Sequence, residues 1–332
     1  MDDEGAPTRG HMLGAHVVGK RVVVRRVLPG RTGPTGGPAM TDVLGICESW
    51  ANGRTVIRRE DGSSVEIRTA DIVSGKPVPP RPSVRMRVSA EEVERRAATQ
   101  LRPLELEHLG DWLLRSTGGS TGRTNSVLPL GDPGLPFDEA LTRVLEFYAE
   151  RKRPAWAQVV VDSPVHLALE ERGWTRARPD EADSEVLLAS VAQARRALQP
   201  PLGSPLVTRA DRLDRGWLAG NDRALASYET VRHQLETNDA LFAAVVSGER
   251  VVARGRATYD DDWVGLTDLY VEPERRRSGL ATVVLTDLLE WAAERGASTA
   301  LLQVLADNEP AQRFYAVLGF RRHHAYRYLA AR

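Results

Sequence analysis

Two proline-rich segments divide this chain of 332 residues and limit the size of any single domain in it. Lys76–Pro82 is typical of a stiff, extended linker, and Gln199–Pro205 is a second one. Because each segment contains several prolines and few other apolar residues, we expect separate structural parts on its two sides. The expected parts are a disordered tail at 1–14, a small domain at 15–78, a linker at 79–88, a second domain at 89–195, a linker at 196–205 and a third domain at 206–332.

Composition and charge exclude several classes of protein. The chain is 42% hydrophobic and 27% charged, the ordinary balance of a globular protein, and its 45 basic and 45 acidic residues leave no net charge. We therefore expect no general attraction to nucleic acid or to an anionic membrane. The single cysteine, Cys47, excludes an internal disulfide framework. No apolar run approaches the roughly 20 residues of a membrane helix, and no signal peptide is recognisable, so a cytoplasmic protein is expected.

The part at 15–78 contains short β-rich runs separated by turn residues. A Gly/Pro-rich loop is expected from Pro29 to Pro38, and Glu60-Asp61-Gly62 is a strong hairpin signal. Several short strands without a helical period predict a small SH3-like barrel. Its basic edge (Arg21, Arg25, Arg26 and Arg31) is consistent with solvated surface, and there is little aromatic interleaving to support nucleic-acid binding.

In the part at 89–195, the capping box Ser89–Glu92 predicts the start of a helix. The elements expected after it are, in order, strand, strand, helix, strand, helix and strand. The first helix of that series begins after Pro136, with one apolar face made by Phe137, Leu141, Val144, Leu145 and Tyr148.

The part at 206–332 is the most regular. We expect strands at Val207–Arg209, Leu241–Val246, Val251–Tyr259, Trp263–Val271, Ala300–Val304 and Phe320–Leu329, with helices within Leu213–Leu235 and at Gly279–Arg295 and Glu309–Leu318. The fold class predicted for the chain is therefore α/β (α+β): a mixed sheet with flanking helices, preceded by a smaller related half and a small β-barrel.

A strand, a turn and a helix start meet at Leu269–Ala281, which contains the pattern Arg276-x-x-Gly279-x-Ala281. Such a junction directs unsatisfied backbone amides and the positive helix end at one point. Gly279 lets an anion approach the backbone, and nearby arginines add positive charge. The pattern suits a pyrophosphate, although a basic turn before an amphipathic helix would look the same. The G-x-G-x-x-G spacing of a dinucleotide fold is absent.

A second element lies about 30 residues further on. Asn308 is a good helix N-cap, Pro310 suits the first turn, and Phe314 and Tyr315 fall near the middle of the helix. Together, the two elements and the order of the elements around them resemble the GNAT superfamily of acetyl-CoA-dependent N-acetyltransferases. The resemblance implies that acetyl-CoA is held by the strand edge, the amide loop and the helix cap, and that Tyr315 protonates the departing thiolate. The cofactor-binding residues so implied are Leu269, Tyr270, Val271, Arg276, Arg277, Ser278, Gly279, Leu280, Ala281, Thr282 and Asn308.

The whole chain also resembles a narrower group, the actinobacterial proteins described as N-acetylglutamate synthases. The residues that carry this resemblance are Gly110–Arg115 and Thr121–Asp132, between a small β domain and the GNAT part. The segment 89–195 looks like a degenerate GNAT half, because Gly131–Pro136 stands where the phosphate loop should be and contains two prolines and an acid. One active site per chain is therefore expected.

The reaction needs a base, because an α-amino group with a pKa near 8 is mostly protonated at pH 7. Asp268 is the first candidate and Glu236 the second, although either could be an ordinary solvated acid. If the acceptor carries carboxylates, planar guanidinium groups suit them best. The candidates are Arg123, Arg254 and Arg256.

These residues predict an N-acetyltransferase that moves an acetyl group from acetyl-CoA to a primary amine, with the α-amino group of L-glutamate as the acceptor that the narrower resemblance implies. The alternatives are another acceptor (a protein N-terminus, a polyamine or an antibiotic) or a non-catalytic protein that senses acetyl-CoA. No metal is expected: Asp260–Asp262 lacks the spacing of a calcium loop, and His323 and His324 should point to opposite faces of a strand. The expected partner is a small amine, not a membrane or nucleic acid, and a homodimer remains open.

Overall fold

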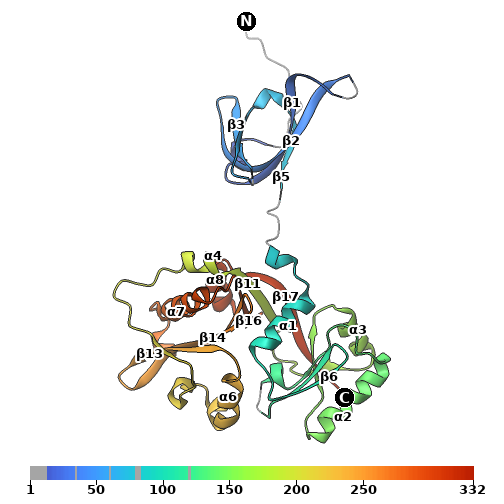
Figure 1. Cartoon of the computed structure of the whole chain (residues 1–332), viewed down its shortest axis with the longest axis vertical. Helices are drawn as coiled ribbons and strands as arrows, with labels where there is room; N and C mark the ends of the chain where they lie inside the picture. Colours follow the sequence, from blue (N-terminus) through green and yellow to red (C-terminus); the bar gives the residue numbers. More distant parts are fainter. Residues whose placement is uncertain (1–12, 34–35, 60, 79–83, 119–120) are drawn as a thin grey trace. The chain divides into compact units, whose positions relative to one another are not determined.

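A computed structural model describes residues 13–33, 36–59, 61–78, 84–118 and 121–332, and the chain divides into two compact units at residues 82 and 83 (Figure 1). Most of the expected tail, residues 79–83 of the first expected linker, and Glu60 of the hairpin signal lie outside the described residues. No helix among the described residues is both long and apolar enough to cross a membrane.

The N-terminal unit is one antiparallel sheet with the strand order β4-β3-β2-β1-β5. Its buried residues Val22, Val24, Val43, Cys47 and Ile57 lie on alternating positions and form a small core, which confirms the predicted β domain. The described strands β4 and β5 stand at the two ends of the sheet and do not pair, so the prediction of a closed barrel is wrong. The strands are β1 (Arg21–Thr32), β2 (Pro38–Ala51), β3 (Arg54–Arg58), β4 (Ser64–Arg68) and β5 (Ile72–Pro77).

The second unit is built on one continuous sheet with the strand order β12-β13-β14-β15-β16-β11-β17-β9-β8-β7-β6, and β10 pairs with β17 outside that path. The fold class predicted from the sequence is therefore confirmed. The strands are β6 (Glu105–Leu109), β7 (Trp112–Ser116), β8 (Val127–Leu128), β9 (Trp156–Val160), β10 (Thr175–Arg176), β11 (Ser184–Ser190), β12 (Thr208–Ala210), β13 (Ala240–Ser247), β14 (Arg250–Asp260), β15 (Trp263–Val271), β16 (Thr299–Leu305) and β17 (Arg321–Ala330).

Helices cover this sheet in the places that the apolar periodicity predicts, with one addition at α4. They are α1 (Ala90–Gln100), α2 (Phe137–Glu150), α3 (Pro164–Glu171), α4 (Val191–Ala197), α5 (Asp222–Ala226), α6 (Tyr228–Leu235), α7 (Leu280–Glu294) and α8 (Glu309–Val317). On α2, Leu141, Val144 and Tyr148 are buried as predicted, but Leu145 is exposed, because it lies beyond the edge of the stripe that faces the sheet.

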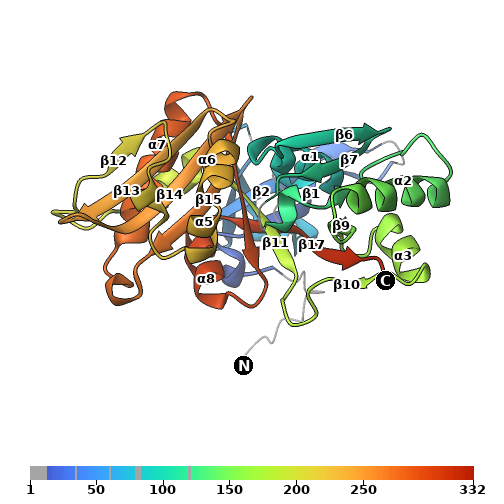
Figure 2. The ribbon, with the colours of Figure 1, turned by 90° about the horizontal axis from the view of Figure 1, so that it is seen from below.

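The strand order joins the two halves expected at 89–195 and 206–332. β11 belongs to the first half in sequence but pairs with β16 along its whole length, from Ser184 opposite Leu305 to Ser190 opposite Thr299. β17, the last strand of the chain, pairs with β11 on one side and with β9 on the other. Figure 2 shows β11 and β17 running between the sets of helices on either side. Each half therefore lends the other a strand, and the hydrogen bonds of one sheet cross from half to half.

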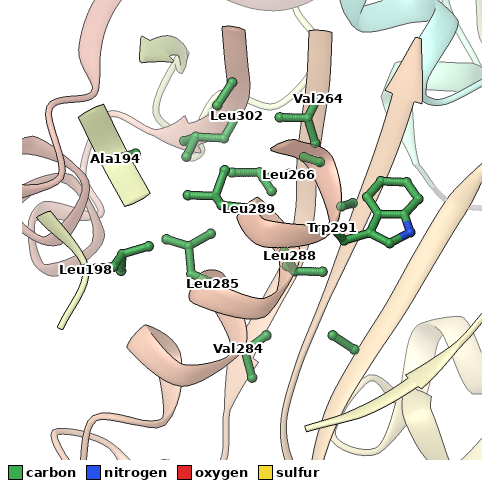
Figure 3. Packing of buried hydrophobic residues seen from close by; sticks show 14 of the residues in the cluster. Ala194, Leu198, Val264, Leu266, Val284, Leu285, Leu288, Leu289, Trp291 and Leu302 are labelled. Atoms are coloured by element: carbon green, nitrogen blue, oxygen red, sulfur yellow. The ribbon is translucent and has the colours of Figure 1, made fainter. Parts of the chain in front are cut away.

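The largest core of the unit lies under α7. Val283, Val284, Leu288 and Trp291 of α7 are buried in this cluster. Figure 3 shows Leu289 of the same helix beside Leu266 and Leu302 of the sheet. Ala194 and Leu198 from the α4 region complete this cluster. Burying each large aliphatic side chain stabilises the fold by about 1.5–3 kcal/mol. These contacts hold α7 on the sheet and so fix the position of its N-terminus.

A β-bulge in β17 corrects the prediction for His323 and His324. The pairing with β11 shifts between Val186, opposite His324, and Leu187, opposite Arg322, so that His323 is an extra residue in the strand. The extra residue breaks the alternation of faces and brings the two rings together, with 2.8 Å between their Nδ1 atoms. His324 Nε2 also lies 2.8 Å from Oε1 of the buried Glu94 on α1. Among the described residues, no group of three or more His, Cys, Asp or Glu side chains could hold a metal ion.

Candidate active site

The central opening of the site is made by two parallel strands that separate. β15 and β16 pair only from Trp263 opposite Thr299 to Leu266 opposite Leu302, although both strands continue beyond these positions. Thr267 and Asp268 on β15, and Gln303, Val304 and Leu305 on β16, then line a cavity of about 420 Å³. On its other side, the end of β15 stays paired with β14, where Tyr270 lies opposite Arg254. The edge of Leu269–Val271 that faces β16 is therefore open to an extended ligand.

A bulge in β15 places Asp268 at this opening. Arg254 lies opposite Tyr270 but Arg256 lies opposite Thr267, so Asp268 and Leu269 together face the single residue Gly255. Asp268 has a φ of 55°, in the left-handed region that few residues other than glycine adopt. Its exposed carboxylate lines the cavity. Strained backbone of this kind concentrates at functional sites, where the surrounding structure holds it in place.

The loop before α7 has the geometry expected for an anion site. Arg277 and Gly279 both have left-handed backbone, with φ of 62° and 84°, and Gly279 caps the helix. Among the described residues, the amides of Arg277–Thr282 donate no backbone hydrogen bond, and the first helical bond runs from Val283 N to Gly279 O (3.1 Å). Free amides at the N-terminus of a well-packed helix fit a pyrophosphate. In the bound state, this loop would hold that part of coenzyme A.

The helix α8 carries Tyr315 as predicted. Asn308 caps the helix, its side-chain oxygen accepting from Ala311 N (3.3 Å), and its amide nitrogen remains for a ligand. The Tyr315 ring packs between Phe314 and Phe320, each with 5.5 Å between ring centroids. Burial raises the pKa of the phenol to about 12, and no described residue forms a hydrogen bond with its hydroxyl. Tyr315 therefore keeps its proton at neutral pH, although it does not line the cavity beside Asp268.

Of the three arginines predicted to bind substrate, only Arg123 lines the cavity. It belongs to the short turn Gly122–Thr124, and its Nη1 donates to Gln303 Oε1 (3.0 Å). Burial lowers the pKa of its guanidinium, but Tyr326, Tyr328, Asp268 and Glu94 together outweigh this effect and the net shift is upward. Arg123 is therefore a stable cation in the wall of the cavity.

Arg254 and Arg256 lie outside the cavity and are bound to backbone carbonyls. Arg254 donates to Ala219 O and stacks between the rings of Trp217 and Tyr270. Arg256 is completely buried and donates to Leu235 O (2.8 Å), and burial lowers its pKa to about 10. Both side chains attach the α5–α6 region to the sheet.

Glu236, the second candidate base, also lies outside the cavity. Its Oε1 accepts from Leu213 N (2.8 Å), and its other oxygen pairs with Arg212 (3.3 Å) and Arg232 (3.7 Å). This carboxylate closes the end of α6, so of the two candidate bases only Asp268 lines the cavity.

Other lining residues have no local signal in the sequence. Tyr326 and Tyr328 reach the cavity from β17, Arg178 and Glu181 from the segment between β10 and β11, and Arg223 from α5. The exchange of strands between the halves brings the residues near β10, β11 and β17 to Asp268, while Arg223 comes from the same half as Asp268. A reader of the sequence would need the strand order to find them.

Comparisons with known proteins agree with this geometry. Residues 89–329 match the family described as "Probable histone acetyltransferase Rv0428c C-terminal". The chain belongs to this family. Residues 16–76 match "Rv0428c N-terminal Sm-like domain", so this part of the chain is Sm-like and the prediction of an SH3-like domain is wrong.

Two curated relatives are also named as acetyltransferases. The chain is 28% identical over 313 residues to the "Probable histone acetyltransferase Rv0428c" of Mycobacterium tuberculosis, covering 89% of this chain and 90% of the relative. It is 26% identical over 240 residues to the "Uncharacterized N-acetyltransferase YobR" of Bacillus subtilis, covering 69% and 93%. The narrower resemblance to N-acetylglutamate synthases is not confirmed by these comparisons.

Two solved structures share the fold. A GCN5-related N-acetyltransferase from Kribbella flavida is 20% identical with a TM-score of 0.52, over 73% of this chain and 95% of that one. A tandem GNAT protein from the clavulanic acid biosynthesis pathway is 13% identical with a TM-score of 0.53, over 72% and 87%. This chain therefore has the GNAT fold, in agreement with the acetyltransferase family that its sequence matches.

Proposed function

We propose that this protein transfers the acetyl group of acetyl-CoA to a primary amine bound in the cavity beside Asp268. The observation that carries the proposal is the separation of β15 from β16 next to the free amides of Arg277–Thr282. An open strand edge can bind the extended arm of coenzyme A while the amide loop binds its pyrophosphate. The bound thioester then supplies the acetyl carbonyl that the amine attacks.

The reaction needs one proton acceptor and one proton donor. Asp268 takes a proton from the ammonium group, directly or through water, and the free amine attacks the carbonyl carbon. The new C–N bond forms, the attacking nitrogen releases its second proton to solvent, the C–S bond breaks and the coenzyme A thiolate leaves. Tyr315 gives this thiolate its proton. A phenol with a pKa of about 12 remains protonated throughout the range in which the amine becomes free, so the two requirements are compatible.

We propose an amino acid as the acceptor, with L-glutamate as the first candidate from the sequence resemblance, which would place the protein at the first step of arginine biosynthesis. The curated relative from Mycobacterium tuberculosis is named as a probable histone acetyltransferase, so lysine side chains of proteins are a second candidate class. Polyamines, protein N-termini and antibiotics complete the set to be tested.

The test measures thiol release from acetyl-CoA with amino acids, histone-tail peptides, polyamines and aminoglycosides as acceptors. We expect saturable turnover with an amino acid, and a loss of about 100-fold or more in kcat for Tyr315→Phe with little change in acetyl-CoA affinity. Because burial raises the pKa of Tyr315, the rate should not fall between pH 8 and pH 10 through ionisation of this phenol. Tight acetyl-CoA binding without any acceptor would instead favour a sensor of acetyl-CoA.

A further inference from the structure

The wall of the acceptor cavity includes a rigid turn from the 89–195 half of the chain. Asn125 Oδ1 accepts from Thr117 N (2.9 Å), and Ser126 Oγ donates to Gly122 O (2.8 Å). Gln234 Nε2, from α6, donates to Thr124 Oγ1 (2.8 Å). Three hydrogen bonds therefore fix the turn that carries Arg123, and one of them comes from the other half.

Gly122 allows β17 to pack closely against this turn. A Cβ atom at position 122 would lie 2.7 Å from Cζ of Tyr328, which real side chains do not tolerate. The ring of Tyr328 therefore lies directly on the backbone beside Arg123, and Tyr326 donates from its hydroxyl to Gln303 Oε1 (3.2 Å). That oxygen is also the acceptor for Arg123 (3.0 Å). The direction of the Arg123 side chain is thus set by packing and by a shared acceptor before any ligand arrives.

Arg123 has capacity for an anion that the described residues do not use. A guanidinium has five N–H donors, and the described structure gives Arg123 one hydrogen bond and no ion pair. Its neighbour Arg178 is different, because its Nη1 pairs with Glu181 Oε2 (2.8 Å). A cation in a partly buried wall without a carboxylate partner is a place where a ligand carboxylate gains both charge pairing and bidentate hydrogen bonds.

The cavity also offers an anion for the other end of such a ligand. Asp268 and Arg123 both line it, yet no ion pair joins these two described residues. With Arg178 and Glu181 paired to each other, the remaining charges are those of Arg123, Arg223 and Asp268. Two cations and one anion complement a ligand with one ammonium and two acidic groups better than a polyamine or a lysine-rich peptide.

We propose that Arg123 binds a carboxylate of the acetyl acceptor, so that the acceptor is a small acidic amino acid and the 89–195 half supplies the specificity of a site whose chemistry belongs to the 206–332 half. This inference rests on the proposed function and goes further by naming the residue that selects an acidic acceptor over the other candidates. The degenerate half then has a role in catalysis, as a binding wall, although its own phosphate loop is blocked by prolines.

The test compares paired acceptors that differ only in charge, using the full chain. Glutamate is measured against its α-carboxamide and against glutamine, with wild type, Arg123→Gln, Arg123→Lys and Arg195→Gln. Arg195 lies exposed on α4 outside the cavity, so its variant is the matched control. Isothermal titration with acetyl-CoA accompanies each variant to show that the coenzyme site is intact.

With the wild-type protein, we expect kcat/KM for one of the two amides to be about 100-fold lower than for glutamate, mainly because KM is higher. Arg123→Gln should lose a similar factor with glutamate but little more with that amide, and Arg123→Lys should fall between them because a lysine keeps the charge without the bidentate geometry. Acetyl-CoA affinity should stay within about twofold for all variants.

Equal rates with glutamate and both amides would overturn the inference. This measurement needs only the wild-type protein, so it does not depend on whether any variant folds. Faster transfer to histone peptides or polyamines than to acidic amino acids would also overturn it, while the proposed acetyl transfer would stand. If no amine accepts the acetyl group, the proposed function fails and the inference fails with it.

Discussion

Gly279 stands where the amide loop meets the second proline-rich segment. Its φ of 84° is strained for any residue with a Cβ, and that Cβ would lie 2.6 Å from Cγ of Pro201. Gly279→Ala should therefore cost about 1–2 kcal/mol for the left-handed backbone and should also displace the loop from the proline. We expect acetyl-CoA affinity to fall at least about 10-fold, measured by calorimetry beside the melting temperature.

The control for this variant is Gly248→Ala. Gly248 has a comparable φ of 63°, but no atom lies within 4 Å of a Cβ built there, in the turn between β13 and β14. It should show a similar loss of stability with unchanged acetyl-CoA affinity. Equal affinity losses in both variants would mean that the loop geometry is not what holds the coenzyme.

The residue types in a sequence indicate which chemistry is possible, but not which of several residues of the same type takes part in it. Arg123, Arg254 and Arg256 are equivalent candidates in a chain with 45 basic residues, most of them arginine. The structure separates them by their hydrogen-bond partners: two are bound to backbone carbonyls and one faces the cavity. That distinction depends on atoms from distant segments, so no local pattern could contain it. Gly279 and Tyr315, in contrast, are recognisable because caps, turns and spacing are local.

At the scale of elements, α1 is attached to the shared sheet by a buried carboxylate. Glu94 lies 2.8 Å from His324 Nε2 of β17 and accepts from Gln158 Nε2 of β9 (2.7 Å). Gln158 in turn accepts from Arg115 Nη2 of β7 (2.9 Å). One side chain on a helix therefore completes hydrogen bonds on strands from both halves.

Glu94→Ala should destabilise the protein by about 3 kcal/mol, because it leaves buried polar groups on β9 and β17 without a partner. Glu91→Ala, on the exposed face of the same helix, should change stability by no more than about 0.5 kcal/mol. The measurement is the free energy of unfolding from urea titrations. A loss below about 1 kcal/mol for Glu94→Ala would show that this carboxylate does not fasten α1.

Elements were easier to predict from sequence than their order in the sheet. Helices and strands follow from apolar periodicity and from caps such as Ser89 and Asn308, and most appear where expected. The insertion of β11 between β16 and β17 could not be predicted from the sequence. An apolar strand such as β11 would pack equally well beside other strands. The bulge at His323 was also missed, because alternation assumes an unbroken strand.

At the scale of the whole molecule, the exchange of β11 and β17 has a consequence for folding. The bounds predicted for a third domain, 206–332, leave β17 without either of its partners β11 and β9, and leave β16 without β11. A strand pair cannot be replaced by solvent without exposing apolar faces such as those of Leu301, Leu302, Ala325 and Leu329, all of which are buried.

We therefore expect a fragment of residues 206–332 to be unfolded or aggregated when expressed alone, and to bind acetyl-CoA only when residues 84–205 are expressed with it. A fragment of residues 84–332 should fold and bind by itself, because the first 82 residues form a separate compact unit. Circular dichroism, size-exclusion chromatography and acetyl-CoA titration distinguish these outcomes. A folded, acetyl-CoA-binding 206–332 fragment would show that the last strand finds other partners and that the two halves are independent domains.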